Sequence, residues 1–403
     1  MKILFITDNF PPEVNAPANR TFEHCREWVK AGNEITVITC APNFPQGRVY
    51  GGYKNRWKSE EMMAGIRVIR VWSYITANEG KIKRILDYAS FGASSFFCGL
   101  SIKTDVIIGT SPQFFSAMSA WVLSIVKRKK WIMEVRDLWP ESIVAVGAMT
   151  NKKLISFLEY LEMKMYGSAR KIVVVTDAFK VKISERGIEA DKILIHKNGV
   201  DLSKYYPGAK PANLVKKHNL EDKFILGYIG THGMAHGLDF VLDQAIELEC
   251  QYPDLHFLFM GDGSNKTNLM ERAEDAQLKN VTFLDSVPKD DVIDYLHLMD
   301  VALVNLIKSD TFLTVIPSKI FEAAAVEKPI MLGLQGETKG IIEQYKAGVC
   351  FEPENGEDFK RALGSMYCKR EDFSVYQEGC RRLALDFERN RIARLMLETI
   401  KSV

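Results

Sequence analysis

Short apolar runs rich in β-branched residues recur along the chain, and stretches with helical spacing of apolar positions separate them. Such runs are typical of strands in parallel sheets, which are buried on both faces. We expect strands at residues 3–7, 35–39, 68–72, 106–109, 131–135, 172–176 and 193–196 in the first half, and at 224–229, 257–260, 281–284, 301–304, 330–332 and 349–351 in the second. The alternation predicts an α/β fold with two doubly wound parallel sheets.

The chain of 403 residues is long enough for two domains, since single cores seldom grow beyond about 250–300 residues. We place the boundary near Asn198-Gly199, where this dipeptide and the following Pro207-Gly208 mark turns. The predicted domains are therefore residues 1–198 and 199–372. Apolar residues at helical spacing predict that the tail, residues 373–403, is a helix.

Composition narrows the class of protein. Apolar residues make up 47% of the chain and charged residues 26%, as in soluble globular proteins. The net charge of +2 argues against a dedicated nucleic-acid binder. The seven cysteines include no C-x-x-C pair, which argues against zinc and a disulfide framework and favours a reducing cytoplasm. The N-terminus lacks a signal-peptide pattern, and no apolar run reaches the ~20 residues of a membrane span.

The stretch PSKIFEAAAVEKPI, residues 317–330, has the features of a nucleotide site. Pro317 and Ser318 predict the start of a helix, whose first-turn amides and dipole favour phosphate. Lys319 adds a positive charge at that point, and the carboxylate of Glu322 can accept hydrogen bonds from two ribose hydroxyls. The alternative is an ordinary capped surface helix with a Lys–Glu pair.

Two glycine-rich loops favour the nucleotide interpretation. Gly230-Thr231-His232-Gly233 and Gly261-Asp262-Gly263 each follow a predicted strand. Glycine lets backbone amides approach a phosphate closely, although each loop alone is also explained as a tight turn. Ligands of such sheets lie at the carboxyl ends of the strands, so we expect a site in a cleft between the domains, with the nucleotide held mainly by the second.

The ordered set of motifs resembles glycosyltransferase family 4. The set comprises Asn198-Gly199-Val200-Asp201, the two glycine loops, Val281-Thr282-Phe283, Val287-Pro288, Asp300-Val301-Ala302-Leu303 and the stretch at 317–330, with Phe10-Pro11-Pro12-Glu13 and Asn43-Phe44-Pro45 in the first half. The stretch VRDLWPES, residues 135–142, looks like the branch that transfers N-acetylfucosamine-type sugars in bacterial O-antigen and capsule assembly.

This resemblance implies a GT-B architecture, in which two Rossmann-like domains face each other across a cleft and the C-terminal helix returns to the first domain. It also implies that no metal and no other cofactor is needed, and the chain has no Asp-x-Asp motif. The donor would be a UDP-sugar, bound as a substrate.

The resemblance also assigns donor residues, with two departures from the family pattern. Glu322 matches the second Glu of the family's E-x7-E motif, which binds the ribose, whereas the first falls at Thr314. Residues 233–237 lack the Arg and Lys that clamp the diphosphate in many members, so we assign that charge to Lys319, assisted by His232 or His236. The expected donor-binding residues are Gly230, Thr231, His232, Gly233, Gly261, Asp262, Phe283, Val287, Thr314, Pro317, Ser318, Lys319, Ile320 and Glu322, of which Lys319 and Glu322 are also expected to be catalytic.

Candidate acceptor residues lie in the first half. Arg136 and Asp137 follow a predicted strand, so Asp137 can orient or deprotonate the acceptor hydroxyl and Arg136 can meet a phosphate. The alternative is a structural Arg–Asp pair, and Glu141 is a weaker candidate base. The other acceptor-binding candidates follow the first strand and are Asn15, Ala16 and Arg20, although Arg20 is equally explained as a solvated helix residue.

A basic segment at residues 48–84 has tyrosine and tryptophan residues interleaved with its cations, and residues 126–131 add further lysines. Aromatic and cationic side chains suit the headgroup region of an anionic membrane, and residues 81–86 can start an interfacial helix. The alternative is a solvated charged face. We expect a cytoplasmic protein associated with the inner face of the cell membrane.

Together these features predict a glycosyltransferase that moves an acetamido-dideoxy sugar, best N-acetyl-L-fucosamine, from UDP to an undecaprenyl-diphosphate-linked sugar. Two alternatives stay open: a sugar-nucleotide epimerase of the same architecture, and a non-catalytic subunit of a polysaccharide assembly complex. A dinucleotide oxidoreductase is disfavoured because no G-x-G-x-x-G fingerprint follows the first strand of either domain.

Overall fold

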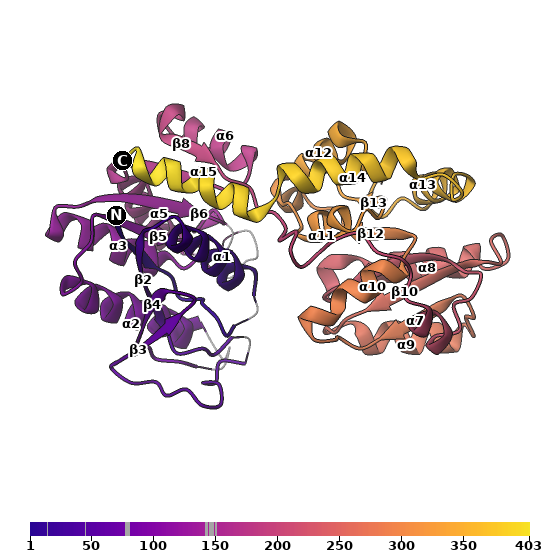
Figure 1. Ribbon diagram of the computed structural model, residues 1–403, viewed down its shortest axis with the longest axis horizontal. Helices are drawn as coiled ribbons and strands as arrows, with labels where there is room; N and C mark the ends of the chain where they lie inside the picture. Colours follow the sequence, from indigo (N-terminus) through magenta and orange to yellow (C-terminus); the bar gives the residue numbers. More distant parts are fainter. Residues whose placement is uncertain (14, 45, 77–80, 142–143, 145–148, 150) are drawn as a thin grey trace. The chain divides into compact units, whose positions relative to one another are not determined.

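The computed structural model describes the chain from Met1 to Val403, apart from residues 14, 45, 77–80, 142–143, 145–148 and 150. The chain divides into two compact units, each built around its own sheet (Figure 1). The first unit contains Met1–Lys197 and Arg389–Val403, and the second contains Asn198–Glu388. All thirteen strands predicted from the apolar runs are present, which confirms the α/β prediction.

The first unit has an eight-stranded sheet in the order β3-β4-β2-β1-β5-β6-β7-β8. Every neighbouring pair is parallel except β3 with β4. The strands are β1 (Lys2–Ile6), β2 (Glu34–Cys40), β3 (Lys58–Met63), β4 (Ile66–Val71), β5 (Val106–Thr110), β6 (Lys130–Val135), β7 (Lys171–Val174) and β8 (Ile193–Ile195). The order reverses between β1 and β5, and their carboxyl ends form the switch point at which ligands of such sheets bind.

The sheet of the first unit is buried on both faces. Along β1, Leu4 and Ile6 pack into the core under α2, α3 and α5, whereas Ile3 and Phe5 pack into the core under α1 and α15. This is why the strands read as continuous apolar runs rather than as alternating patterns. The helices are α1 (Ala16–Lys30), α2 (Lys81–Leu100), α3 (Phe114–Lys127), α5 (Lys152–Ser168), α6 (Asp177–Glu185) and α15 (Arg389–Lys401).

Strand β3 was not predicted. Its sequence, KSEEMM, alternates between half-buried and exposed positions and has no buried residue, because it lies at the edge of the sheet and pairs only with β4. The edge is also charged: Glu60 pairs with Lys58 and Arg67, as expected for a strand that must not recruit another chain.

The second unit has a six-stranded, fully parallel sheet in the order β11-β10-β9-β12-β13-β14. Its strands are β9 (Phe224–Ile229), β10 (Leu255–Met260), β11 (Val281–Leu284), β12 (Val301–Asn305), β13 (Ile330–Gly333) and β14 (Gly348–Phe351). One face is covered by α8, α9 and α13 and the other by α10, α11, α12 and α14. Here the strand order reverses between β9 and β12, which defines a second switch point.

The helices of the second unit are α7 (Ala212–Lys217), α8 (Leu238–Leu248), α9 (Lys266–Asp275), α10 (Val292–Leu298), α11 (Lys319–Ala325), α12 (Glu337–Tyr345), α13 (Gly356–Cys368) and α14 (Ser374–Asp386). None of the helices described in either unit combines the length and the apolar character needed to cross a bilayer.

The tail is two helices, so the prediction of one helix over residues 373–403 is wrong. Helix α14 belongs to the second unit and α15 to the first. The break falls at Phe387, which leaves the helical conformation and stacks on Phe321 with 4.9 Å between ring centroids. Glu388 then forms an isolated parallel β-bridge with Val200. The segments by which the chain enters and leaves the second unit therefore lie side by side. Packing of the half-buried Phe387 against Phe321 therefore overrides the helical pattern of the sequence.

Helix α15 completes the core of the first unit by packing on α1 (Figure 1). The indole Nε1 of Trp28 donates to the Ala393 carbonyl at 2.8 Å, and Arg389 forms an ion pair with Glu23. Met396 and Ile400 are fully buried beside Trp28, whereas Leu395 points outward with 52% of its surface exposed.

We expect Met396→Ala to lower the free energy of unfolding of the first unit by about 2–5 kcal/mol, because the truncation leaves a cavity beside Trp28. The control Leu395→Ala is expected to change it by less than about 0.5 kcal/mol. All six tryptophans precede residue 140, so their fluorescence during urea unfolding reports on the first unit alone. Equal losses in the two variants would show that α15 does not complete this core.

Candidate functional site

In the second unit, three predicted segments meet at the carboxyl ends of β9, β10 and β12. Gly230, directly after β9, has a φ of 142°, and a Cβ placed on it would lie 2.4 Å from Nζ of Lys319. Gly261, directly after β10, has a φ of 144°, and a Cβ there would lie 1.9 Å from the Gly230 carbonyl oxygen. Both positions therefore need glycine, for conformation and for space. The glycine loops lie backbone against backbone, with Lys319 beside them.

Lys319 lies over the aromatic ring of Tyr228. Its Nζ is 3.8 Å from the ring centroid and donates to the phenol oxygen at 2.6 Å, while the Tyr228 hydroxyl donates to the Thr231 carbonyl at 2.7 Å. The residue is partly exposed, but its amine is enclosed by protein, and this burial lowers the pKa of Lys319 to about 7 despite the nearby Glu322. Burial also raises the pKa of Tyr228, which keeps the phenol neutral. An anionic ligand beside this amine would therefore stabilise its protonated form.

Two histidines flank this lysine. His232 is fully buried, and neither of its ring nitrogens has a hydrogen-bond partner within the described residues. Burial lowers the pKa of His232 to about 4, with smaller effects from the charges of Lys266 and Lys319. Burial likewise lowers the pKa of His236 to about 4. Both imidazoles are therefore neutral at pH 7, and the ring of Phe283 packs edge-on against His232 at 6.4 Å.

The start of α11 offers less to a phosphate than the sequence indicated. Ser318 occupies the N-cap position, but its hydroxyl makes no capping bond, and the helix has only seven residues. The amides of Ile320 and Phe321 already donate to the carbonyls of Pro317 and Ser318 at 3.3 and 3.0 Å. The amine of Lys319, when it is protonated, is consequently the main cationic feature at the start of α11. Glu322 lies one turn further along the same short helix.

The remaining predicted donor residues lie around this cluster or close to it in sequence. Asp262 is exposed, and its carbonyl accepts from the His232 amide at 2.8 Å. Val287 is half-buried after β11. Thr314 ends a short 3-10 helix, Asp310–Thr314, that reaches toward α12, since a Cβ on Gly336 would lie 2.1 Å from the Leu313 carbonyl. Gly233 begins a second 3-10 turn, Met234–His236.

Three residues near this site were missed. They are Tyr228, Lys266 and Asn305. Lys266 is 9% exposed and donates to the carbonyls of Gly261 and Leu284 and to the carboxylate of Asp285, so it connects the loops after β10 and β11. Asn305 at the end of β12 donates to the His236 carbonyl at 2.9 Å, and its Oδ1 has no partner within the described residues. Asn305 ends β12, whereas Tyr228 lies within β9 and Lys266 begins α9, so the position at a strand end is a sequence signal for Asn305 alone.

A hollow of the second unit, with a volume of about 790 Å³, lies away from Lys319, beside α8 and α13. Glutamates and aspartates dominate its charged lining: Asp243, Glu247, Glu352, Glu354 and Glu357 against Lys308 and Lys360. An anionic nucleotide would be repelled there, so we place the candidate nucleotide site at Lys319 instead.

In the first unit, a cavity of about 400 Å³ opens at the carboxyl ends of β1, β2, β5 and β6. Two of the predicted acceptor residues line it, Asn15 and Asp137. Asn15 also caps α1 by accepting from the Ala18 amide at 2.8 Å, and Ala16 is the first residue of that helix. Glu141 lies apart from the lining and pairs with Lys182 at 2.5 Å. The cavity therefore brings together only part of the predicted acceptor set.

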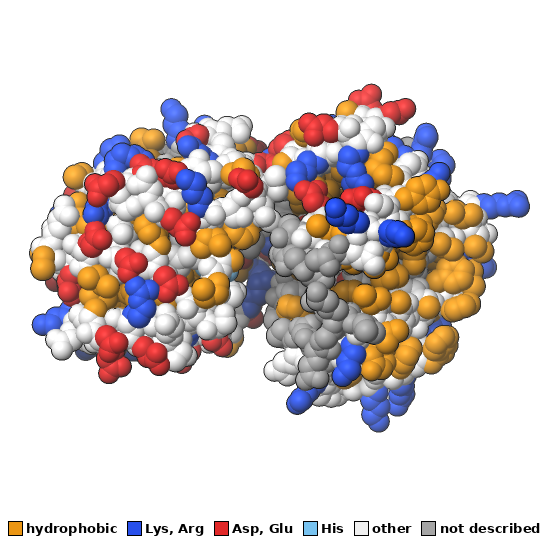
Figure 2. Space-filling view, turned by 180° about the vertical axis from the view of Figure 1, so that it is seen from behind, with side chains coloured by type: hydrophobic (Ala, Val, Ile, Leu, Met, Phe, Trp, Pro, Cys, Tyr) orange, Lys and Arg blue, Asp and Glu red, His pale blue; other side chains and the backbone are white. Residues whose placement is uncertain are grey.

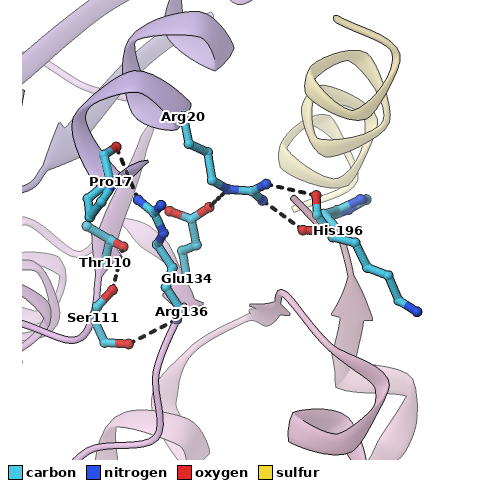
Figure 3. A network of polar contacts seen from close by, with 8 residues as sticks. Pro17, Arg20, Thr110, Ser111, Glu134, Arg136 and His196 are labelled. Carbon is cyan, nitrogen blue, oxygen red and sulfur yellow. Dashed lines mark hydrogen bonds and ion pairs between the residues drawn. The ribbon is translucent and has the colours of Figure 1, made fainter. Parts of the chain in front are cut away.

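Arg20 and Arg136 belong to a buried network beside this cavity (Figure 3). Nε of Arg20 donates to Glu134 at 3.0 Å, and its terminal nitrogens donate to the carbonyls of Lys197 and His196 at 2.9 and 2.8 Å. Arg136 donates to the Pro17 carbonyl at 3.2 Å, and burial lowers the pKa of its guanidinium to about 10. Burial alone would raise the pKa of Glu134, but the two arginines together lower it.

The network contradicts the expectation that Arg20 binds an acceptor phosphate. Arg20 is only 3% exposed, and its donors are used by the carboxylate and the two carbonyls. It fixes the end of β8 to α1 and keeps Glu134 charged. Binding a phosphate would require Arg20 to break these bonds and would leave Glu134 buried without its ion pair, which is unfavourable.

We expect Arg20→Met to lower the free energy of unfolding by about 3–5 kcal/mol at pH 7, because Glu134 is left buried without its ion pair. The pKa of Glu134 lies below its usual 4.5 in the wild type, so its stabilising effect is present above that value and is lost as the pH falls through the lower folded value. The difference between variant and wild type should therefore shrink below pH 4.5. Urea unfolding followed by tryptophan fluorescence measures the loss of stability at pH 7 and its dependence on pH. A variant of wild-type stability would restore the phosphate-binding hypothesis for Arg20.

Comparison with known proteins agrees with this architecture. Residues 15–199 match a model described as a glycosyl transferase 4-like domain, and residues 211–376 match glycosyl transferases group 1. The Escherichia coli (strain K12) protein WcaI, named as a candidate colanic acid biosynthesis glycosyl transferase, is 26% identical over 370 residues, which cover 89% of this chain and 90% of WcaI.

Solved structures show the same fold at low sequence identity. A sucrose-phosphate synthase from Thermosynechococcus elongatus superposes with a TM-score of 0.75 at 14% identity, covering 100% of this chain and 98% of its own. HepE from Anabaena, solved in complex with UDP and glucose, superposes with a TM-score of 0.72 at 14% identity, covering 100% of both chains. The chain is thus a glycosyltransferase of the GT-B fold, in which a glycosyl transferase 4-like domain precedes a group 1 domain.

Proposed function

We propose that this glycosyltransferase transfers an acetamido-dideoxy sugar, best N-acetyl-L-fucosamine, from UDP to an undecaprenyl-diphosphate-linked sugar in the synthesis of a capsule or O-antigen polysaccharide. The observation that carries the donor half of this proposal is the enclosed amine of Lys319 at the switch point of the second sheet. Burial of this amine lowers its pKa to about 7, and an anionic ligand beside it would favour its charged form.

The parts of a nucleotide site surround that amine. The two glycine loops let a diphosphate approach their backbones, and protonated Lys319 supplies a positive charge that stabilises the negative charge developing on the leaving UDP. Glu322 is assigned to the ribose, and Phe283 with Val287 offers an apolar surface for the base. The imidazoles of His232 and His236 are neutral at pH 7, so they can exchange hydrogen bonds with the donor but add no charge.

Two relatives support the pathway and the donor. WcaI is named for colanic acid biosynthesis, and HepE was solved with UDP and glucose. The N-acetylfucosamine and the undecaprenyl carrier rest on the resemblance of residues 135–142 alone. Asp137 at the cavity of the first unit remains our candidate for orienting the acceptor hydroxyl.

A lipid-linked acceptor requires a surface that can contact a membrane, and the first unit offers a candidate. Helices α2 and α3 pack closely because a Cβ on Gly99 would lie 2.5 Å from Leu123. Beside this contact, five apolar side chains are 37–59% exposed: Phe97, Leu100, Val122, Ile125 and Val126. We call them the α2–α3 patch. Figure 2 shows hydrophobic side chains gathered on the first unit with lysines and arginines at their margin.

Cations adjoin one end of the α2–α3 patch. The exposed Arg128, Lys129 and Lys130 follow α3 directly, and Lys127 donates to the Leu100 carbonyl at 2.8 Å. An apolar surface with a basic border fits an anionic leaflet. The segment at 48–84 contributes less charge than we expected, because Arg67 pairs with Glu60 and Arg70 is buried against Glu61.

We expect Lys319→Met to weaken UDP-sugar binding roughly 10- to 100-fold, the usual cost of losing a hydrogen bond to a charged group. Wild-type affinity should fall as the pH rises above about 7, where free Lys319 loses its proton, and the variant should lack this dependence. Calorimetric titration with a panel of UDP-sugars measures the affinity and its pH dependence, at pH values of roughly 6 to 9 that span the Lys319 pKa of about 7. The control is Lys308→Met, whose side chain is 66% exposed in an ion pair with Glu352.

The stability of the variant separates lost binding from lost folding. Burial disfavours charged Lys319, so wild-type stability falls as the pH drops from 10.5 toward about 7, and the full penalty applies below it. Lys319→Met should therefore be at least as stable as the wild type at neutral pH. Mass spectrometry of products then tests the reaction. Transfer to a polyprenyl-diphosphate sugar supports the proposal, whereas donor turnover without acceptor indicates an epimerase, and binding without turnover indicates a non-catalytic subunit.

We expect the double variant Ile125→Ser/Val126→Ser to lose most of its flotation with vesicles that contain anionic lipid, because it removes two exposed apolar side chains of the α2–α3 patch. The control is Val375→Ser on α14, where a similarly exposed valine lies in the second unit. Wild-type flotation should also weaken as salt is added. Flotation that is unchanged in the double variant would place the membrane contact elsewhere.

A further inference from the structure

The cavity of the first unit has a chemical character that the sequence did not predict. Four carboxylates line it, Asp8, Glu13, Asp87 and Asp137, and no Lys, Arg or His is among the described residues of its lining. The other polar groups are mostly amides, from Asn9, Asn15, Asn43 and Gln113. Its volume of about 400 Å³ is within the range of small-molecule sites.

Glu13 is the residue that points to a ligand. It is 2% exposed, and its Oε1 accepts from the backbone amides of Asn43 and Phe44 at 2.8 and 2.9 Å. Those bonds hold the carboxylate in place, yet Oε2 is buried without any partner in the described part of the chain. A buried, unpartnered acceptor is costly, and a ligand donor in the cavity would remove that cost.

The apolar part of the lining matches the faces of a sugar ring. Phe44, Tyr88, Phe91 and Trp139 line the cavity, and Trp139 is held by Phe114 with 4.5 Å between ring centroids. Sugar rings present C–H groups on their faces and hydroxyl groups at their edges. Aromatic surfaces suit the former, and carboxylates and amides suit the latter.

We propose that this cavity binds a sugar ring of the acceptor that carries no phosphate, and that Glu13 Oε2 accepts a hydrogen bond from a hydroxyl or amino group of that ring. The inference rests on the proposed transferase function and narrows its acceptor. The carboxylates repel phosphate, so the diphosphate of a lipid carrier must lie outside the cavity. Burial raises the pKa of Glu13 and of Asp8, and the smaller opposing effects of Arg70 on Glu13 and of Arg136 on Asp8 do not cancel it.

The test uses the full chain with tryptophan labelled at the indole nitrogen. The chain has six tryptophans, and the Trp139 signal is assigned by its absence in Trp139→Phe. The probes are methyl glycosides of glucose, galactose and their 2-acetamido derivatives, and the corresponding sugar 1-phosphates. We expect at least one methyl glycoside to shift the Trp139 signal, and each 1-phosphate to bind more weakly than its methyl glycoside.

Glu13→Gln keeps the volume of the side chain but replaces the acceptor Oε2 with an NH₂ donor. We expect it to weaken glycoside binding at least about tenfold, as for other hydrogen bonds that involve a charged group. The matched control is Glu162→Gln, because Glu162 is also 2% exposed but does not line the cavity. Glycoside binding should be unchanged in that control.

Several outcomes would overturn the inference: stronger binding of the 1-phosphates at Trp139, equal glycoside binding by Glu13→Gln, or no response from any glycoside at millimolar concentration. The wild-type comparison stands even if Glu13→Gln does not fold. UDP-sugar binding is measured on the same samples. Donor binding and transfer with no glycoside at Trp139 would reject only this inference, whereas glycoside binding without UDP-sugar binding would reject only the proposed donor reaction.

Discussion

The candidate donor site depends on the close contact between the loops that follow β9 and β10. Side chains at Gly230 and Gly261 would collide with Lys319 and with the neighbouring backbone. Their absence lets the two loops meet and leaves a narrow space in which the amine of Lys319 lies over Tyr228. The same contact excludes water from the amine and so lowers its pKa. The two glycines are thus the common cause of the contact between the loops and of the lowered pKa of Lys319.

Partner count separates structural charges from functional ones in this fold. Arg20 and Glu134 are deeply buried, but the arginine has a carboxylate and two carbonyls as partners, and the pKa of the glutamate is lowered. Lys319 and Glu13 are also enclosed, but their pKa values move toward the neutral form. The first pair stabilises the fold by itself. Lys319 and Glu13, by contrast, can still make interactions with a substrate. Lys319 can offer a cation, and Glu13 can offer a hydrogen-bond acceptor.

Much of the fold could be predicted from the sequence because parallel strands buried on both faces have a simple pattern. The pattern failed for β3, an exposed edge strand, and at Phe387, where tertiary packing ends a helix that the local spacing would continue. The glycine loops and Lys319 were also found, since each follows a strand. Tyr228 lies inside a strand and Lys266 on a helix, so only the folded chain shows that they adjoin the site. Arg20 was misjudged because its distant partners, such as Glu134 and His196, cannot be identified from sequence spacing.

The surface and the cavity of the first unit together constrain how a lipid-linked acceptor can bind. The α2–α3 patch offers apolar side chains beside exposed cations, a combination that suits lipid tails and anionic headgroups. The cavity at the carboxyl ends of the strands offers carboxylates, amides and aromatic rings, a combination that suits an uncharged sugar and repels phosphate. A molecule with a lipid, a diphosphate and a sugar chain satisfies both only if a sugar ring that carries no phosphate enters the cavity while the diphosphate stays outside it. If the acceptor is the lipid-linked sugar that we propose, the charge distribution of this unit favours a direction in which its sugar lies toward the strand ends, where Asp137 is.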